Sequence, residues 1–383
     1  MKVTLFFTYG ISLKRWAERG ILKREISFYK KLIDSYGIEV LFVTYGDETD
    51  RRWEKDLKGI ELLPVYERLR QPKFKVLGLL QSLFIPSTFR RELTASDLFK
   101  TNQIWGGWVA VVAKWRLHRP LLTRCGYDFH EFIQRKGNRK LLQRFAWLIS
   151  YLTYNQADKI HVATKANQKT IHKKFSVPIE KMEIRPNWID TNRFQQTKDT
   201  KTLRLLSVGR LDQQKNLPLL FDAIQGTNIG VDIVGVGPES DSLRQLAGQK
   251  HIDVNFIGQL SSDEMPNIYN QHAIYVLCSK YEGNPKTLLE AMACGNAVIG
   301  TDVAGIQDII IHEKNGLLVP EEPMALRDAI YLLMGNSNLR NHLGSAARIQ
   351  VVEYNSLDKA LYNESKAYTT LIAPKIKQEC KNA

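Results

Sequence analysis

Residues 274–301, IYVLCSKYEGNPKTLLEAMACGNAVIGT, contain two short apolar segments on either side of a helix-favouring stretch. The segments IYVLCS (274–279) and NAVIGT (296–301) have the length and composition of buried strands. Between them, TLLEAMACG (287–295) favours a helix that ends at a glycine. A strand, a helix and a second strand in this order predict a unit of two parallel strands with a crossover helix.

The same alternation extends over the whole chain. In the first half it predicts strands at KVTLFF (2–7), GIEVLFVTY (37–45), PLLTRC (120–125) and KIHVAT (159–164), and a helix at 21–37. In the second half it predicts further strands at LRLLSVG (203–209), GVDIVGVG (230–237), VNFIG (254–258) and GLLVP (316–320), with helices at 217–225 and 265–271. The predicted class is α/β, with two doubly wound, Rossmann-like domains that face a cleft.

The chain has 383 residues, which is too long for one ordinary hydrophobic core. The rhythm of strands and helices stops at 184–202, IRPNWIDTNRFQQTKDTKT, where a proline and many polar residues gather. We therefore predict an N-terminal domain at 1–188 and a C-terminal domain at 189–356. A helix at about 357–383 is expected to pack back on the N-terminal domain.

Positive charge is concentrated in the first half of the chain. Residues 1–188 contain 35 Lys and Arg against 18 Asp and Glu, a balance of +17, whereas residues 189–383 contain 19 against 22, a balance of −3. This asymmetry indicates that the first half faces an anionic partner, such as a phosphorylated acceptor, an acidic membrane or nucleic acid. A solvated basic surface that aids solubility is the alternative explanation.

Four cysteines lie far apart and without metal-ligand spacing, at Cys125, Cys278, Cys294 and Cys380. This usage predicts a reducing, cytoplasmic environment. The first residues, KVTLFFTYG, favour a strand over a signal peptide, and the longest apolar stretches, 76–85 and 104–115, are too short to span a bilayer. We expect a cytoplasmic protein that is either free or attached peripherally to the cytoplasmic face of a membrane.

Two glutamates, Glu282 and Glu290, lie on opposite sides of a predicted helix start, with seven residues between them. Pro285 suits the first position of a helix, and Asn284 is a plausible cap. The first backbone amides of a helix have no partner within it, so they form an anion site. A carboxylate on each side of a pocket for a diphosphate would suit a nucleotide sugar, one binding hexose hydroxyls and the other ribose hydroxyls. On spacing alone, both would be ordinary surface glutamates.

Residues 203–320 resemble the donor-binding half of retaining glycosyltransferases of family 4, which have the GT-B fold. The resemblance is carried, in the family's order, by SVGRLDQQKNLPLLFDAI (207–224), IVGVGPESDSL (233–243), VNFIGQLSSDEMPNIYNQHAIYVLCS (254–279) and YEGNPKTLLEAMACGNAVIGTDVAGIQDIIIHEKNGLLV (281–319), which contains the Glu-x7-Glu motif. The first half is similar at ADKIHVATKANQKTI (157–171) and at the interdomain segment RPNWID (185–190), where Trp188 replaces glycine.

The resemblance implies a donor-binding C-terminal domain and an acceptor-binding N-terminal domain. The implied donor site comprises Gly209, Arg210, Lys215, Gly237, Ile257, Glu282, Gly283, Asn284, Pro285, Lys286, Thr287, Leu288 and Glu290. Within it, Arg210 and Lys215 would bind the leaving diphosphate and Glu282 the transferred sugar. The chain contains no Asp-x-Asp pair. We therefore expect no metal and no cofactor, the nucleotide sugar being a co-substrate.

The acceptor side resembles the family less closely. In TRCGYDFHEF (123–132), Gly126 and Asp128 match the family's His-Gly-x-Asp segment, but Cys125 stands where histidine is common. Asp128 is a candidate catalytic and acceptor-binding residue, and His130 a candidate acceptor contact. In the loop at 8–26, Arg19 and Gly20 are the remaining candidates for acceptor binding.

The resemblance implies transfer of a hexose-type sugar, with retention of configuration, to an acceptor hydroxyl in the assembly of a cell-surface polysaccharide or glycolipid. The basic first half, with the apolar and basic stretches 73–93 and 105–122, would suit an anionic membrane that presents a lipid-linked sugar. A nucleotide-sugar epimerase of the same architecture is an alternative. A basic nucleic-acid-binding protein is another, although no recognised reader motif is present and no nucleic acid is expected.

Overall fold

The computed structural model describes residues 1–126, 133, 140–197 and 200–382. The chain divides into two compact units, each described here by itself. The N-terminal unit contains Met1–Arg185 together with the chain from Leu361 onward, and the C-terminal unit contains Pro186–Ala360. The division lies within the polar segment at 184–202 that interrupts the sequence pattern.

The N-terminal unit is built on a sheet of seven strands in the order β3-β2-β1-β4-β5-β6-β7. Every neighbouring pair is parallel. The strands are β1 (Lys2–Phe6), β2 (Glu39–Thr44), β3 (Ile60–Pro64), β4 (Leu98–Thr101), β5 (Leu121–Cys125), β6 (Lys159–Val162) and β7 (Met182–Ile184). The order reverses direction between β1 and β4, and open α/β sheets bind ligands at the carboxyl ends of the strands on either side of such a reversal.

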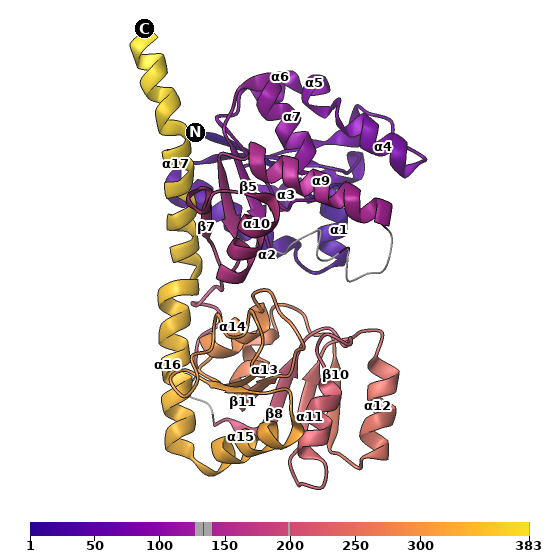
Figure 1. Cartoon of the computed structure of the whole chain (residues 1–383), viewed down its shortest axis with the longest axis vertical. Coiled ribbons are helices and arrows are strands. Elements are labelled where there is room, and N and C mark those ends of the chain that lie inside the picture. The colour runs from indigo at the N-terminus through magenta and orange to yellow at the C-terminus, as the bar shows by residue number, and fades with distance from the viewer. Residues whose placement is uncertain (127–132, 134–139, 198–199, 383) are drawn as a thin grey trace. The chain divides into compact units, whose positions relative to one another are not determined.

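Helices connect these strands (Figure 1). They are α1 (Leu13–Glu18), α2 (Leu22–Tyr36), α3 (Glu54–Leu57), α4 (Lys75–Ser82), α5 (Ile85–Thr88), α6 (Arg90–Thr94), α7 (Gly107–Leu117), α9 (Lys140–Gln156) and α10 (Lys165–Phe175), with 3-10 helices η1 (Glu48–Trp53), η2 (Val65–Glu67) and η3 (Ile179–Lys181). Helix α2 is capped by Gly37, whose φ of 60° lies in the left-handed region that favours glycine.

The C-terminal unit has a parallel six-stranded sheet in the order β10-β9-β8-β11-β12-β13, which reverses between β8 and β11. Its strands are β8 (Thr202–Val208), β9 (Val231–Val234), β10 (Val254–Gly258), β11 (His272–Leu277), β12 (Ala297–Thr301) and β13 (Leu317–Val319). Its helices are α11 (Leu217–Ile224), α12 (Ser240–Gln249), α13 (Met265–Gln271), α14 (Lys286–Ala293), α15 (Pro323–Gly335) and α16 (Ser337–Asn355).

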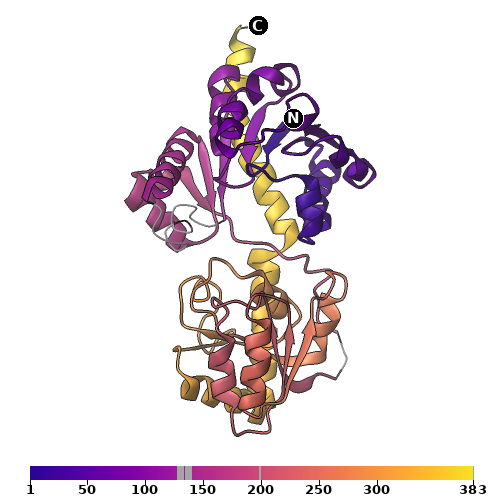
Figure 2. The ribbon, with the colours of Figure 1, turned by 90° about the vertical axis from the view of Figure 1, so that its right-hand side faces the viewer.

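Successive residues of the C-terminal strands belong to two different hydrophobic cores. In β11, Ile274 and Val276 pack in the core that contains Phe221 of α11. Tyr275 and Leu277 pack in a second core with residues of α14. Because side chains alternate across a strand, the two cores lie on opposite faces of the sheet. Figure 2 shows helices on both sides of the sheet, so the prediction of two doubly wound, Rossmann-like domains is confirmed.

Helix α17 (Leu357–Asn382) enters the N-terminal unit at Leu361 and contributes a buried carboxylate. Glu364 pairs with Lys100 of β4, whose Nζ also donates a hydrogen bond to the hydroxyl of Tyr368 at 3.1 Å. The other oxygen of Glu364 lies 3.4 Å from Nδ1 of His161 on β6. Burial alone would raise the pKa of Glu364, but the charge of Lys100 and the contact with His161 hold it well below its ordinary value. The helix is therefore joined to the sheet by a buried ion pair.

Candidate active site

The residues that the sequence assigns to the donor gather where the C-terminal sheet reverses its strand order. Strand β8 ends at Val208 and is followed by the loop that carries Lys215. Strand β11 ends at Leu277 and leads through the loop of Glu282 into α14. These are the two strands on either side of the reversal. Ligands of open α/β sheets bind at this place because the loops on either side diverge and leave a crevice.

Glu282 is held by two side chains. Its Oε1 accepts hydrogen bonds from Nζ of Lys215 at 2.6 Å and from Oγ of Ser279 at 2.7 Å. Lys215 and Glu282 are 67 positions apart in the chain, and their side chains are 17% and 8% exposed. This is not the environment of a surface glutamate. The fold therefore joins a cation and a carboxylate, both largely shielded from water, at the reversal point.

The helix start beside this pair differs from the predicted one. Helix α14 begins at Lys286, and Pro285 is its cap residue rather than its first residue. Asn284 does not cap it, because its Oδ1 accepts a hydrogen bond from the amide of Asn187 at 2.8 Å. Its carbonyl also accepts one from Nδ2 of Asn187 at 2.6 Å. Asn284 thus fixes the loop to the segment after the unit boundary, and the cap prediction was wrong.

The first turn of α14 still presents an anion-binding end. The amides of Lys286, Thr287 and Leu288 belong to the first turn, where intrahelical acceptors are lacking. The hydroxyl of Tyr275 donates to Oγ1 of Thr287 at 2.9 Å, and the ammonium of Lys286 lies 5.5 Å from the centre of the Trp188 ring. The helix end, Lys286 and the nearby Lys215 together favour the binding of a negatively charged group.

Glu290 lies one turn further into α14 and is also supported. The hydroxyl of Tyr269, on α13, donates to Oε2 of Glu290 at 2.9 Å. Burial raises the pKa of Tyr269 well above its ordinary value, and the charge of Glu290 raises it further, so the phenol stays protonated and remains a donor. Sequence reasoning did not find Tyr269, because a buried tyrosine in an apolar segment has the signal of an ordinary core residue.

The glycine and arginine after β8 occupy different environments. A Cβ at Gly209 would lie 2.8 Å from Cε of Lys215, so this glycine allows the lysine to cross close to the strand end. Gly209, Arg210 and Lys215 line one small pocket. The side chain of Arg210 is 73% exposed and its Nε lies 3.8 Å from Asp212. Of the two predicted phosphate-binding cations, only Lys215 contacts the glutamate in this structure.

The other donor candidates lie at neighbouring strand ends. Gly237 follows β9 and packs against the backbone of Leu211, where a Cβ would lie 2.1 Å from the carbonyl oxygen. Ile257 lies on β10 and is partly buried. Gly283 lies in the Glu282 loop, and its carbonyl would be 2.4 Å from a Cβ on Gly305. Gly305, which the sequence did not identify, has a φ of 84°, and its backbone lies close to the carbonyls of Glu282 and Gly283.

The acceptor candidates are in the N-terminal unit. Arg19 and Gly20 form an exposed turn between α1 and α2, where Gly20 has a φ of 66°. Asp128 and His130 lie outside the described residues. Cys125 ends β5 as a buried thiol that accepts a hydrogen bond from the hydroxyl of Tyr154 at 3.1 Å. Packing, rather than exposure to substrate, therefore accounts for the thiol at the position where the family commonly has histidine.

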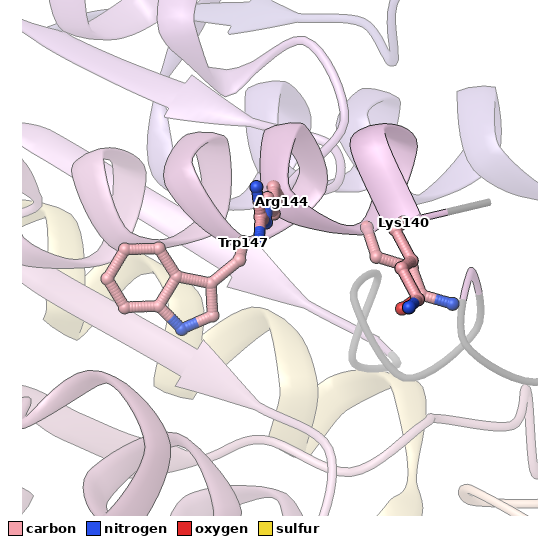
Figure 3. A pocket seen from close by; sticks show the side chains of 4 residues that line it. Lys140, Arg144 and Trp147 are labelled. Carbon is pink, nitrogen blue, oxygen red and sulfur yellow. The ribbon is translucent and has the colours of Figure 1, made fainter. Parts of the chain in front are cut away.

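A pocket of about 270 Å³ lies on α9, directly after the stretch that holds Asp128. Figure 3 shows Lys140, Arg144 and Trp147 on successive turns of this helix, and Gln143 also lines the pocket. Lys140 and Arg144 supply two cations that would suit an anionic ligand, and Trp147 adds an aromatic side chain to the same pocket. The sequence pattern did not indicate this pocket.

Within the described part of the chain, no group of three or more His, Cys, Asp or Glu side chains could hold a metal ion. Among the same residues, no helix is both long and apolar enough to cross a bilayer.

Two family models match the chain. Residues 189–350 match the model described as glycosyl transferases group 1, and residues 30–193 match the model described as glycosyltransferase family 4. The two matches fall on the two halves of the chain in order, and together they extend from 30 to 350.

Curated relatives agree with these matches. An uncharacterized glycosyltransferase, MJ1607, from Methanocaldococcus jannaschii is 26% identical over 63% of this chain and 65% of its own length. The N-acetylgalactosamine-N,N'-diacetylbacillosaminyl-diphospho-undecaprenol 4-alpha-N-acetylgalactosaminyltransferase of Campylobacter jejuni is 33% identical over 52% of this chain and 56% of its own length. The chain thus spans about half to two thirds of the length of these two relatives and of three others like them.

Solved structures show the same fold over nearly the whole chain. The Anabaena protein Alr3699/HepE in complex with UDP has a TM-score of 0.77 at 17% identity and covers 97% of this chain and 100% of its own. Sucrose-phosphate synthase from Thermosynechococcus elongatus has a TM-score of 0.77 at 18% identity, with 98% and 100% covered. With both halves matched by family models and the two-domain fold shared, the chain belongs to the group 1 and family 4 glycosyltransferases.

Proposed function

We propose that the protein is a metal-independent, retaining glycosyltransferase that moves a hexose-type sugar from a nucleoside diphosphate sugar to an acceptor hydroxyl. The observation that carries the proposal is the Lys215–Glu282 pair beside the start of α14, at the reversal point of the C-terminal sheet. A cation and a helix end suit the diphosphate, and a carboxylate beside them suits the hydroxyls of the attached sugar.

The leaving group is stabilised by fixed positive charge in this proposal. As the bond between the anomeric carbon and the diphosphate oxygen breaks, negative charge grows on that oxygen. Lys215, which pairs with Glu282 in the free protein, then shares its ammonium with the diphosphate. The exposed guanidinium of Arg210 lines the same small pocket and turns onto the phosphates. The amides of α14 add to this field.

Glu282 serves as a sugar-binding group rather than as a nucleophile. Its Oε1 is engaged by Lys215 and Ser279, and this holds the carboxylate in place while it accepts hydrogen bonds from hexose hydroxyls. The acceptor hydroxyl attacks from the face that the diphosphate leaves, and its proton passes to the departing phosphate oxygen. One C–O bond forms and one breaks, and because both bonds lie on the same face of the sugar ring, the configuration at the anomeric carbon is retained.

The acceptor is proposed to be a lipid-linked sugar, in the assembly of a polysaccharide or glycolipid at a cytoplasmic membrane face. The Campylobacter jejuni relative is named for an acceptor carried on diphospho-undecaprenol. The basic N-terminal half and the pocket of Lys140, Arg144 and Trp147 suit an acceptor that carries phosphate and sugar. The extent of membrane attachment is part of this proposal.

A thermal-shift screen tests donor binding directly. We expect nucleoside diphosphates and their sugars to raise the unfolding temperature, starting with UDP and UDP-glucose, which occupy related solved structures. Glu290→Ala should weaken binding of the bare diphosphate, whereas Glu282→Ala should chiefly impair transfer. Asp328→Ala, which removes an exposed carboxylate of α15, is the matched control. Equal behaviour of all three variants would refute the site.

The reaction itself is tested with donor alone and with donor plus acceptor. A transferase releases the nucleoside diphosphate in proportion to added acceptor, whereas an epimerase consumes the donor without one. The anomeric proton of the product, followed by NMR, reports retention or inversion. Activity that persists in EDTA supports catalysis without a metal, and activity restored only by Mg²⁺ or Mn²⁺ contradicts it.

A further inference from the structure

A stripe of large apolar side chains is exposed on α4 and the turns at its two ends. The stripe consists of Phe74, Val76, Leu77, Leu80, Leu83 and Phe84, which are between 37% and 68% exposed. The last five follow helical spacing at positions i, i+1, i+4, i+7 and i+8, so they share one face. A contiguous apolar surface of this kind is uncommon on a soluble protein unless it contacts something.

The opposite face of α4 is anchored to the N-terminal unit. Nε1 of Trp108 donates to Oγ of buried Ser82 at 2.8 Å, and Leu79 packs on the core that contains Trp108. Gly78 lies against Tyr9, where a Cβ would be 2.4 Å from the hydroxyl. The fold therefore fixes which face of α4 points outward. The inner face already packs α4 on the N-terminal unit without any residue of the apolar stripe.

The sequence on both sides of the stripe is basic. Residues 68–91 contain six Lys or Arg and no Asp or Glu. Arg68 pairs with Glu92 at 2.5 Å. Arg70, Lys73, Arg90 and Arg91 are exposed, and no ion pair is recorded for them within the described part of the chain. An apolar stripe whose neighbours in sequence from 68 to 91 include cations and no acid is the pattern of a helix that lies in the surface of an anionic bilayer.

We propose that α4 and the α4–α5 turn form a docking surface for an anionic lipid bilayer. The stripe enters the boundary between headgroups and acyl chains, and the flanking cations contact lipid phosphates. We favour the bilayer over a protein partner because residues 68–91 carry cations and no acidic side chain, which complements anionic lipid headgroups. The second apolar and basic stretch, 105–122, is not part of this surface, because α7 is buried on most of its sides. Most of α7 packs in the core, and membrane contact through the exposed end of the stretch, at Trp115 and Arg116, stays a prediction.

Docking through α4 would place the acceptor side of the N-terminal unit at the membrane. Tyr9, which contacts Gly78, follows β1 and hydrogen bonds through its amide to the carbonyl of Trp105, after β4, at 3.0 Å. The reversal point of the N-terminal sheet therefore lies beside the inner face of α4. This placement rests on the proposed lipid-linked acceptor, but the docking itself does not require a reaction.

Vesicle flotation of the whole protein without donor tests the proposal. We expect binding to phosphatidylglycerol-containing vesicles and none to phosphatidylcholine vesicles, with binding lost at high salt. Leu77→Ser/Leu80→Ser should reduce vesicle partitioning at least about tenfold. Ile349→Ser/Val352→Ser, which changes exposed apolar residues of α16, is the matched control and should bind like the unmodified protein.

The basic flank is tested separately. Lys73→Gln/Arg90→Gln should lower partitioning about 30-fold, from a contribution of about fivefold for each cation. Lys165→Gln/Lys169→Gln removes two exposed lysines of α10 and the same amount of charge, and should have a much smaller effect. Because all these side chains are exposed, unfolding midpoints and the thermal shift with UDP should be unchanged. That second readout separates failure of docking from failure of the donor site.

Three outcomes would overturn the proposal. The first is absence of binding to anionic vesicles at low salt. The second is equal binding by the α4 variants and their controls. The third is a dimer in sedimentation equilibrium that Leu77→Ser/Leu80→Ser dissociates without any effect on vesicle binding, which would assign the stripe to a second copy of the chain.

Discussion

Removing the charge of Glu364 should strongly destabilise the N-terminal unit. Lys100 and Glu364 have side chains only 2% and 9% exposed, so neither charge has water as an alternative partner. Loss of one member of a buried pair typically costs about 3–5 kcal/mol. The rings of Tyr29 and Tyr368 lie 5.3 and 5.6 Å from Nζ of Lys100 and offer partial compensation. We therefore expect Glu364→Gln to lower the free energy of unfolding by about 3 kcal/mol, the lower end of that range.

Urea denaturation followed by tryptophan fluorescence measures this change. Six of the seven tryptophans lie in residues 1–185, so the signal reports mainly on the N-terminal unit. For a unit of this size, about 3 kcal/mol corresponds to a fall of roughly 6–12 °C in the unfolding temperature. Glu18→Gln is the matched control, because Glu18 is exposed and lies 3.5 Å from Arg15, and it should cost at most about 0.5 kcal/mol.

A double variant separates the buried charge from the loss of shape. Lys100→Met/Glu364→Leu removes both charges, and replacement of a buried pair by apolar residues is often neutral or stabilising. We expect it to recover much of the stability lost in Glu364→Gln. If Glu364→Gln is no more harmful than Glu18→Gln, or if the double variant is the least stable of the three, the buried pair does not hold α17 in the way described.

Three further predictions concern pH, the nucleotide and the loop. Burial lowers the pKa of His161 below its ordinary 6.5, so the folded state binds its proton less readily than the unfolded state does. The free energy of unfolding should therefore fall as the pH drops below about 6.5. Denaturation titrations at several pH values should show a flatter pH dependence for His161→Gln than for the unmodified protein. Tyr269→Phe should weaken binding of the diphosphate about threefold to tenfold, because it removes one hydrogen bond that positions the Glu290 carboxylate. Unchanged affinity in calorimetry would show that this hydrogen bond does not support nucleotide binding. Gly305→Ala should reduce both stability and nucleotide binding, whereas Gly226→Ala, also at positive φ but facing open space, should cost about 1–2 kcal/mol without affecting the nucleotide.

The fold class and the donor segment could be predicted because their signals are local. The alternation of apolar strands and periodic helices can be recognised in short segments of the sequence, and it predicted two doubly wound domains. The Glu-x7-Glu segment with its loop and helix start is likewise contiguous, and the structure places both glutamates at the strand reversal. The cap at Asn284 failed because a distant residue, Asn187, engages its side chain.

The tertiary structure alone decided which partners meet and which apolar stretch is exposed. Lys100 and Glu364 are 264 positions apart, and Lys215 and Glu282 are 67 apart, so no local pattern reveals these pairs. The apolar stretches around α4 and α7 look alike in sequence, yet one faces outward and the other fills the core. Local propensity specifies what each segment forms, whereas burial, charge pairing and exposure depend on packing between segments far apart in the chain.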